Sequence, residues 1–221
     1  MDNRSRQQLV QFLESNDLVS VVSLVKENRR MLSQLVRLAY NKETLTGWRA
    51  IEAIGAAARA IVSQEYAFLR EMIRKLLWSL SDESGGIGWS APEIIGEIVC
   101  SDPVRFQDII PIISGIYDIE EEVFRPGILY ALSRIGEEYP ELILSQKDLA
   151  IRALSDHNPL VRYFGLEVIS RIKSSLTPHD RDFVDTCIGR LLNDKEEVWV
   201  YKENRFLNVQ LAEAVSGVLN S

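Results

Sequence analysis

The strongest candidate for anion binding in this sequence is a glycine-rich loop, DESGGIG at residues 82–88, which runs into Trp89 and a predicted helix. Backbone N–H groups at a helix N-terminus can bind an anion. The loop contains two acids, however, and no strand precedes it and no lysine follows at the spacing of a phosphate-binding P-loop. We therefore interpret it as a turn that needs positive φ, and we keep Gly85, Gly86 and Trp89 as candidate contacts for a protein partner.

Metal and thiol chemistry have little support in the sequence. Cys100 and Cys187 each stand inside a helical pattern, with no second Cys or His at ligand spacing. We predict two small buried thiols, no disulfide framework and no metal site. No catalytic residue and no cofactor are predicted either.

A second candidate site is a row of glutamates. Four predicted helices carry a glutamate at the same position, and a fifth has Ser133 there; the four are Glu52, Glu93, Glu167 and Glu213. Carboxylates aligned along one groove would attract a basic peptide or helix. The alternative is an ordinary solvated position that forms pairs such as Arg49 with Glu52, worth about 0.2–0.5 kcal/mol each.

An internal repeat indicates which elements position these residues. The segment GWRAIEAIG from Gly47 returns as GWSAPEIIG from Gly88, with six of nine residues identical and a period of 41. Apolar residues recur at intervals of three and four, which predicts helices, and no stretch shows sustained period-two alternation. A short helical repeat cannot bury its own apolar face, so the sequence predicts a stack of helical pairs.

The pairs are marked by a polar turn residue at Asn41, Asp82, Asp118, Asp156 and Asp194. Predicted helices cover about 4–15, 17–27, 29–40, 44–62, 64–80, 90–100, 103–117, 123–138, 146–154, 159–174, 178–192 and 204–219. From the turn residue to a small residue (Gly or Ser) inside the next helix there are 14 sequence positions in three repeats and 22 in the last, from Asp194 to Ser216. We interpret that growth as about two added helical turns.

The second helices contain glycines such as Gly55, which have no side chain and therefore predict a close approach of a neighbouring helix. Trp48 lies on the apolar face of its helix with Ile51 and Gly55, so Trp48 and Trp89 are interpreted as packing residues. The alternative is a surface aromatic anchor for a partner.

The segment SDHNPLVRYFGLEVISRI from Ser155 resembles the entry to the second helix of HEAT repeats, with Asp156, Pro159, Val161 and Arg162 in the order D-x-x-P-x-V-R. The other repeats keep parts of this pattern. The resemblance implies an all-α, right-handed α-solenoid of about five HEAT-like pairs over residues 29–221, behind an N-terminal helical cap at residues 1–28. It also implies that the second helices, with the glutamate row, line a concave side.

Some enzymes share HEAT-like architecture. Iron hydroxylases of this kind need repeated His-Glu pairs, whereas His157 is followed by Asn and His179 by Asp. The sequence has no recognisable motif of a phycobilin lyase. Alkylpurine DNA glycosylases use aromatic residues and an Asp over a basic groove, but residues 82–141 carry 13 acidic and 3 basic side chains. An acidic surface of this kind makes duplex DNA a poor ligand.

The bulk composition agrees with a chain that is ordered throughout. Its 221 residues are 46% hydrophobic and 26% charged, with a net charge of −7. The longest nearly apolar stretch, 109–117, is too short to cross a bilayer, and the start MDNRSRQQ is unlike a signal peptide. We expect a cytoplasmic, non-catalytic module that binds proteins and neither nucleic acid nor membranes, with a DNA-processing enzyme of the glycosylase type as the alternative.

Overall fold

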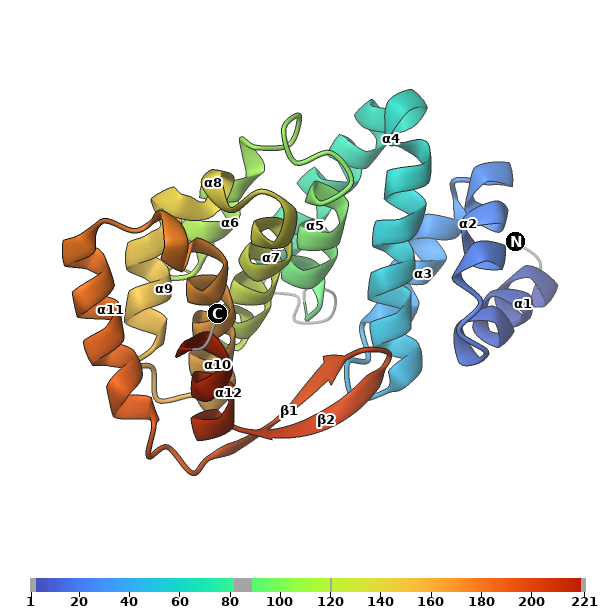
Figure 1. Ribbon diagram of the computed structural model, residues 1–221. Coiled ribbons are helices and arrows are strands. Elements are labelled where there is room, and N and C mark those ends of the chain that lie inside the picture. Colours follow the sequence, from blue (N-terminus) through green and yellow to red (C-terminus); the bar gives the residue numbers. More distant parts are fainter. Residues whose placement is uncertain (1–2, 82–88, 120, 220–221) are drawn as a thin grey trace. The chain divides into compact units, whose positions relative to one another are not determined.

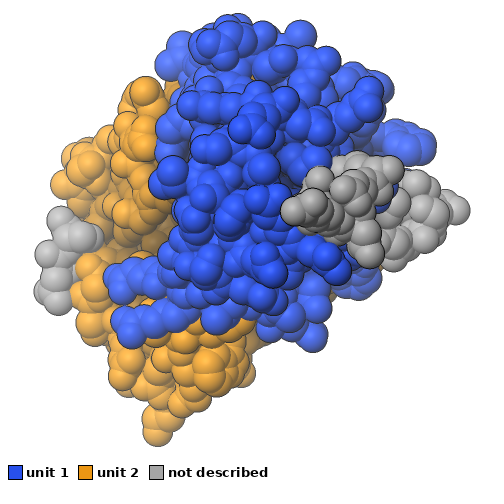
Figure 2. Space-filling view, turned by 90° about the vertical axis from the view of Figure 1, so that its right-hand side faces the viewer, with its two compact units in different colours: residues 1–105, 203–205 blue, residues 106–202, 206–221 orange. Residues whose placement is uncertain are grey.

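The computed structural model describes residues 3–81, 89–119 and 121–219, and the side chains from residue 6 onward. In these ranges the regular structure is helical apart from one two-stranded sheet (Figure 1). The predicted all-α class is therefore confirmed. The chain divides into two compact units, residues 1–105 with 203–205 and residues 106–202 with 206–221 (Figure 2). We refer to them as unit 1 and unit 2.

Unit 1 is built around one long helix. Its helices are α1 (Asn3–Glu14), α2 (Leu18–Glu27), α3 (Met31–Ala39), α4 (Leu45–Leu80) and α5 (Ala91–Val99). The helices α1, α2, α3 and α5 all contact α4. Two separate helices were predicted over 44–80; the structure has one helix with a non-helical residue, Glu65 (φ −118°, ψ 26°), close to the predicted break.

The repeated Gly-Trp pair has a packing role at residues 47–48. A Cβ on Gly47 would overlap the Asn41 carbonyl, while the Gly47 N–H donates to the Thr44 hydroxyl that caps α4 (3.1 Å). Trp48 is buried, as predicted. Further along α4, Gly55 lies against the Glu97 side chain of α5 with no room for a Cβ, which confirms the predicted close approach of helices.

Unit 2 consists of short helices and a hairpin. Its helices are α6 (Ile109–Ile116), α7 (Arg125–Glu138), α8 (Pro140–Ile143), α9 (Lys147–Ala153), α10 (Pro159–Ile172), α11 (Pro178–Leu191) and α12 (Leu211–Leu219). Single 3₁₀ turns lie at Glu122–Phe124, Leu144–Gln146 and Lys173–Ser175. The helix predicted from 103 is shorter than expected, because residues 103–108 form turns and α6 begins at Ile109.

Helices pair in unit 2 as the repeat predicted. α6 contacts α7, α9 contacts α10, and α11 contacts α12. The second helices of the pairs also contact one another in order, with α10 packed against both α7 and α12 (Figure 1). The apolar core of the unit lies between these helices and includes Ile128, Leu132, Val161, Val168 and Ile172.

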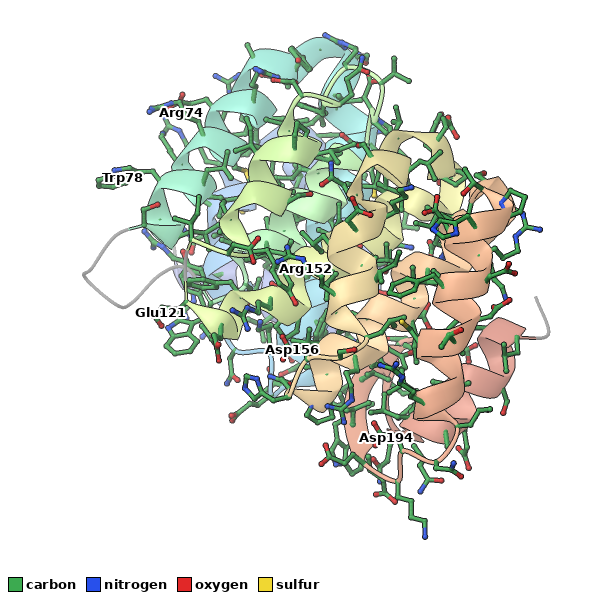
Figure 3. The ribbon with its side chains drawn as sticks, turned by 90° about the vertical axis from the view of Figure 1, so that its left-hand side faces the viewer. Arg74, Trp78, Glu121, Arg152, Asp156 and Asp194 are labelled. Atoms are coloured by element: carbon green, nitrogen blue, oxygen red, sulfur yellow. The ribbon has the colours of Figure 1, made fainter. Side chains whose placement is uncertain are left out.

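Charged pairs join consecutive repeats of unit 2. Arg125 Nη1 lies 3.3 Å from Asp156 Oδ2, and Arg162 Nη2 lies 2.9 Å from Asp194 Oδ2. The turn residues Asp156 and Asp194, labelled in Figure 3, also accept hydrogen bonds from backbone N–H groups two residues later, at 2.9 and 3.1 Å. The arginine of the D-x-x-P-x-V-R pattern, Arg162, thus binds the aspartate of the next turn, and Arg125 makes the equivalent contact one repeat earlier.

The C-terminal repeat differs from the prediction, which was wrong in placing a helix from residue 204. Residues Glu197–Lys202 and Arg205–Gln210 form the hairpin strands β1 and β2, and α12 begins only at Leu211. The N–H groups of Leu211 and Ala212 donate to the carbonyls of Glu196 and Asp194. After the hairpin, the chain therefore comes back to the turn at Asp194 and Glu196. The extra residues of the last repeat form an inserted hairpin, and the predicted two additional helical turns are wrong.

Glu203 and Asn204 form the two-residue hairpin loop with positive φ values of 51° and 62°. This is the backbone that a two-residue hairpin favours. Among the described residues, no helix is both long enough and apolar enough to span a membrane.

Candidate functional site

The candidate site is a small groove in unit 2, bordered by α7, α10 and β1. We call it the α7–α10 groove. Its volume is about 70 Å³, and the residues that line it are Tyr130, Ser133, Arg134 and Glu137 of α7, Tyr163, Phe164, Glu167 and Arg171 of α10, and Val200, Tyr201 and Lys202 of β1. The groove contains Glu167 of the predicted glutamate row and Ser133, which takes the same position one repeat earlier.

Helical spacing brings these residues to one surface. The α7 residues are separated by three, one and three positions, which places them along one helix face, and Phe164, Glu167 and Arg171 follow the matching spacing on α10. Gly136 sets the distance between the two helices, because a Cβ there would lie 3.0 Å from Arg171 Cβ and would overlap the end of Ile143. The absence of a side chain at Gly136 therefore lets α7 and α10 approach.

Charged side chains form a network across the groove. Glu137 accepts from Arg134 with one oxygen and from Arg171 Nη2 (2.9 Å) with the other. Glu167 Oε1 accepts from the Tyr163 hydroxyl (3.1 Å) and lies 3.6 Å from Lys202 Nζ, and its Oε2 accepts from Arg171 Nη2 (3.5 Å). Both carboxylates are thus held by side chains of the protein itself.

Aromatic rings form the apolar wall. Phe164 packs edge-to-face against Tyr130 (5.7 Å between ring centroids) and against Tyr163 (5.2 Å). Burial, together with the nearby Glu167 carboxylate, raises the pKa of Tyr163 far above its ordinary value. Its hydroxyl therefore stays protonated at neutral pH and serves as a hydrogen-bond donor.

One donor in the groove has no protein partner. Arg171 Nε is buried and makes no hydrogen bond, although the same guanidinium binds two glutamates through Nη2. A buried donor without an acceptor costs free energy. Because this atom is shielded from solvent, a ligand could supply an acceptor here only after a shift of the Arg171 side chain.

The other predicted residues lie in different surroundings. Glu52 is half-buried on α4, and Glu213 is exposed on α12. Glu93 is buried on α5, only 3% exposed, and its Oε1 lies 2.7 Å from Lys42 Nζ while its Oε2 has no hydrogen-bond partner. The expectation that Glu93 is a solvated position is therefore wrong.

Trp89 is 48% exposed, so the interpretation of this residue as a packing element is wrong, and its role as a contact for a partner stays a prediction. Gly85 and Gly86 lie outside the described residues. Cys100 and Cys187 are buried, as predicted. Within the described ranges, no group of three or more His, Cys, Asp or Glu side chains is placed to hold a metal ion.

Sequence reasoning found Glu167 and Ser133 but missed most of the groove. Glu137 and Arg171 lie one helical turn beyond those two positions, so extending the same face by four residues would have found both. The contribution of β1 could not be found that way, since a helix was predicted through part of the hairpin. Two exposed tryptophans were also missed: Trp78 at the end of α4, which projects outward with Arg74 (Figure 3), and Trp199 of β1.

A larger hollow lies in unit 1. It measures about 670 Å³ and is lined by residues 25–30 together with Ala60, Ile61, Gln64 and Glu65 of α4. Its floor residues Val25 and Ile61 are already buried, and Arg29 is paired with Glu65 and lies over the Phe68 ring. The hollow contains none of the predicted site residues.

Comparisons with known proteins concern the fold. No family model matches the chain, and no curated protein matches it. Among solved structures, the chain is similar to the archaeal HEAT-like repeats protein from Thermococcus onnurineus NA1, with 15% sequence identity, a TM-score of 0.39, and coverage of 97% of this chain and 98% of that one.

Proposed function

We propose that the chain is a non-catalytic protein-interaction module and that unit 2 binds a partner polypeptide in the α7–α10 groove. The main support is the combination of aromatic and charged side chains that two consecutive second helices and β1 bring to one small depression. Stacked helical repeats commonly bind partners along the surface formed by successive repeats. A volume of about 70 Å³ is far below the roughly 300–1,000 Å³ of small-molecule sites, and it suits a single side chain of a peptide.

The hydrogen bonds of the two glutamates also favour binding over catalysis in this groove. The carboxylates of Glu137 and Glu167 accept from arginine and tyrosine donors, so neither is free to act as a general base. No observation on the described residues favours the DNA glycosylase alternative. A cytoplasmic location remains a proposal that follows from the composition.

Site-specific photo-crosslinking tests the proposal. A photoreactive amino acid is placed at Lys202, which lines the groove, and separately at Lys195, which is exposed and lies outside it. After irradiation in the source cell, we expect the chain with the label at position 202 to capture a protein that the 195 label does not. Equal capture from both positions, or direct binding of that purified protein unaffected by the groove variant Lys202→Glu, would count against the groove as the binding surface.

A further inference from the structure

We infer that the α7–α10 groove receives an acidic side chain of a partner polypeptide. This inference rests on the proposed function and adds the chemistry of the partner. It reverses the charge of the basic partner predicted from the glutamate row.

The first support is that each carboxylate oxygen of Glu137 and Glu167 already accepts one hydrogen bond from the protein. Each oxygen of Glu137 accepts a hydrogen bond from an arginine, and the two oxygens of Glu167 accept from Tyr163 and Arg171. A lysine or arginine entering the groove would have to compete with these donors. A basic side chain would therefore gain little at Glu167, the member of the row that lines this groove.

The second support is that donors remain. Arg171 Nε is buried without an acceptor. Lys202 Nζ forms an ion pair with Glu167 at 3.6 Å, too long for a hydrogen bond, and the Lys202 side chain is 54% exposed, so its ammonium can also contact an incoming group. A carboxylate with its two acceptor oxygens matches what the groove offers.

The third support is the balance of charge and the shape. Three cationic side chains, Arg134, Arg171 and Lys202, line the groove with only two carboxylates, so the local charge favours an anion. The Phe164 ring and its tyrosine neighbours supply an apolar wall for the methylene groups that precede a carboxylate. Both features suit an aspartate or glutamate of a peptide.

Selection from a random peptide library tests the inference directly, because it imposes no charge or sequence on the ligand. Phage that display random dodecapeptides are selected on the intact chain, and selected peptides are then synthesised and measured by fluorescence anisotropy. The groove variant is Lys202→Glu, and the matched control is Lys195→Glu. Thermal melting of both variants shows whether they fold, and both positions are exposed.

We expect acidic peptides whose affinity falls about tenfold with Lys202→Glu and less than about twofold with Lys195→Glu. Replacing the critical peptide glutamate by lysine should restore binding to Lys202→Glu, because the charges are exchanged. Basic or uncharged peptides that still depend on Lys202 would overturn the acidic partner but leave the proposed function standing. Peptides that bind both variants alike, or no selected peptide, would overturn the inference together with the proposed function.

Discussion

Arg162 Nη2 lies 2.9 Å from Asp194 Oδ2. Asp194 is the turn residue of the next repeat, 38 positions after the equivalent Asp156. The side chains of Arg162 and Asp194 are only 11% and 14% exposed. The same arginine donates to the carbonyls of Asp156 (2.7 Å) and His157 (3.1 Å). One guanidinium therefore holds the turn of its own repeat and the turn of the next one.

Loss of this pair should destabilise unit 2 clearly. We expect Asp194→Ala to lower the free energy of unfolding by about 2–3 kcal/mol, because it leaves a mostly buried guanidinium with only the exposed carboxylate of Glu196, at 3.2 Å. Chemical denaturation measures the change. Asp118→Ala is the control, since the Asp118–Arg152 pair is exposed and should contribute about 0–1 kcal/mol. Similar losses in both variants would argue against a special role of the repeat-joining pair.

A larger residue at position 136 should push α7 and α10 apart and destabilise unit 2. Gly136→Val places side-chain atoms against Arg171 and Ile143, and we expect a loss of about 1–3 kcal/mol by overpacking. At Gly189 a Cβ would meet nothing within 4 Å, so Gly189→Ala should be neutral or stabilising by up to about 1 kcal/mol. Thermal melting of the two variants checks both, and a tolerated valine at 136 would contradict the assigned packing.

The buried pair in unit 1 leads to a third prediction. Lys42→Met leaves the Glu93 carboxylate buried without its cation, and we expect a loss of about 1–3 kcal/mol. Adding Glu93→Gln removes the charge, so the double variant should be more stable than Lys42→Met alone. Urea unfolding of the three proteins measures this coupling. A double variant no more stable than Lys42→Met would mean that the lysine does not compensate the carboxylate.

Tyr117 should make folding sensitive to alkaline pH. Burial first, and then the charge of Asp156, raise the pKa of Tyr117 from 10.0 to about 12. Between these values the unfolded chain has lost the phenolic proton while the folded chain retains it, so stability falls as pH rises through this window. We expect Tyr117→Phe to show a smaller fall in melting temperature between about pH 10 and about pH 11.5. An identical slope in both proteins would contradict a raised pKa in the folded state.

Much of the fold could be predicted because interactions between residues close in the sequence determine the turns and helices of each repeat. The turn residues Asp156 and Asp194 bind backbone N–H groups two positions later, and the glycines at 47 and 55 stand where another group fills the space of a side chain. These signals act within a few residues or recur with the period, so a single sequence reveals them.

The β-hairpin was missed because its signals compete with helical ones. Residues 198–201 are valine, tryptophan, valine and tyrosine, a composition that favours a strand, but they do not alternate with polar residues. The turn at Glu203 and Asn204 contains no glycine, and α12 follows directly after β2. The burial of Glu93 was missed for another reason. Its partner Lys42 lies 51 residues away, and a glutamate at a repeated position is more often exposed than buried.

Only part of the candidate site could be inferred. Glu167 was predicted from its register, but its carboxylate accepts a hydrogen bond from Tyr163 and pairs with Arg171 and Lys202, and Lys202 comes from the hairpin. Net charge of a segment gives no guide to such pairing. The charge that the groove presents to a ligand therefore depends on side-chain contacts that the sequence does not reveal.

Hydrogen–deuterium exchange of the intact chain, with and without the protein captured by the crosslinking at position 202, tests the central proposal most directly. A partner held in the α7–α10 groove should slow amide exchange in residues 130–137, 163–171 and 200–202, and leave the hollow at residues 25–30 and 60–65 unchanged. Protection confined to the hollow of unit 1, or no protection in the three groove segments at saturating partner, would contradict the assignment of the α7–α10 groove as the partner-binding surface.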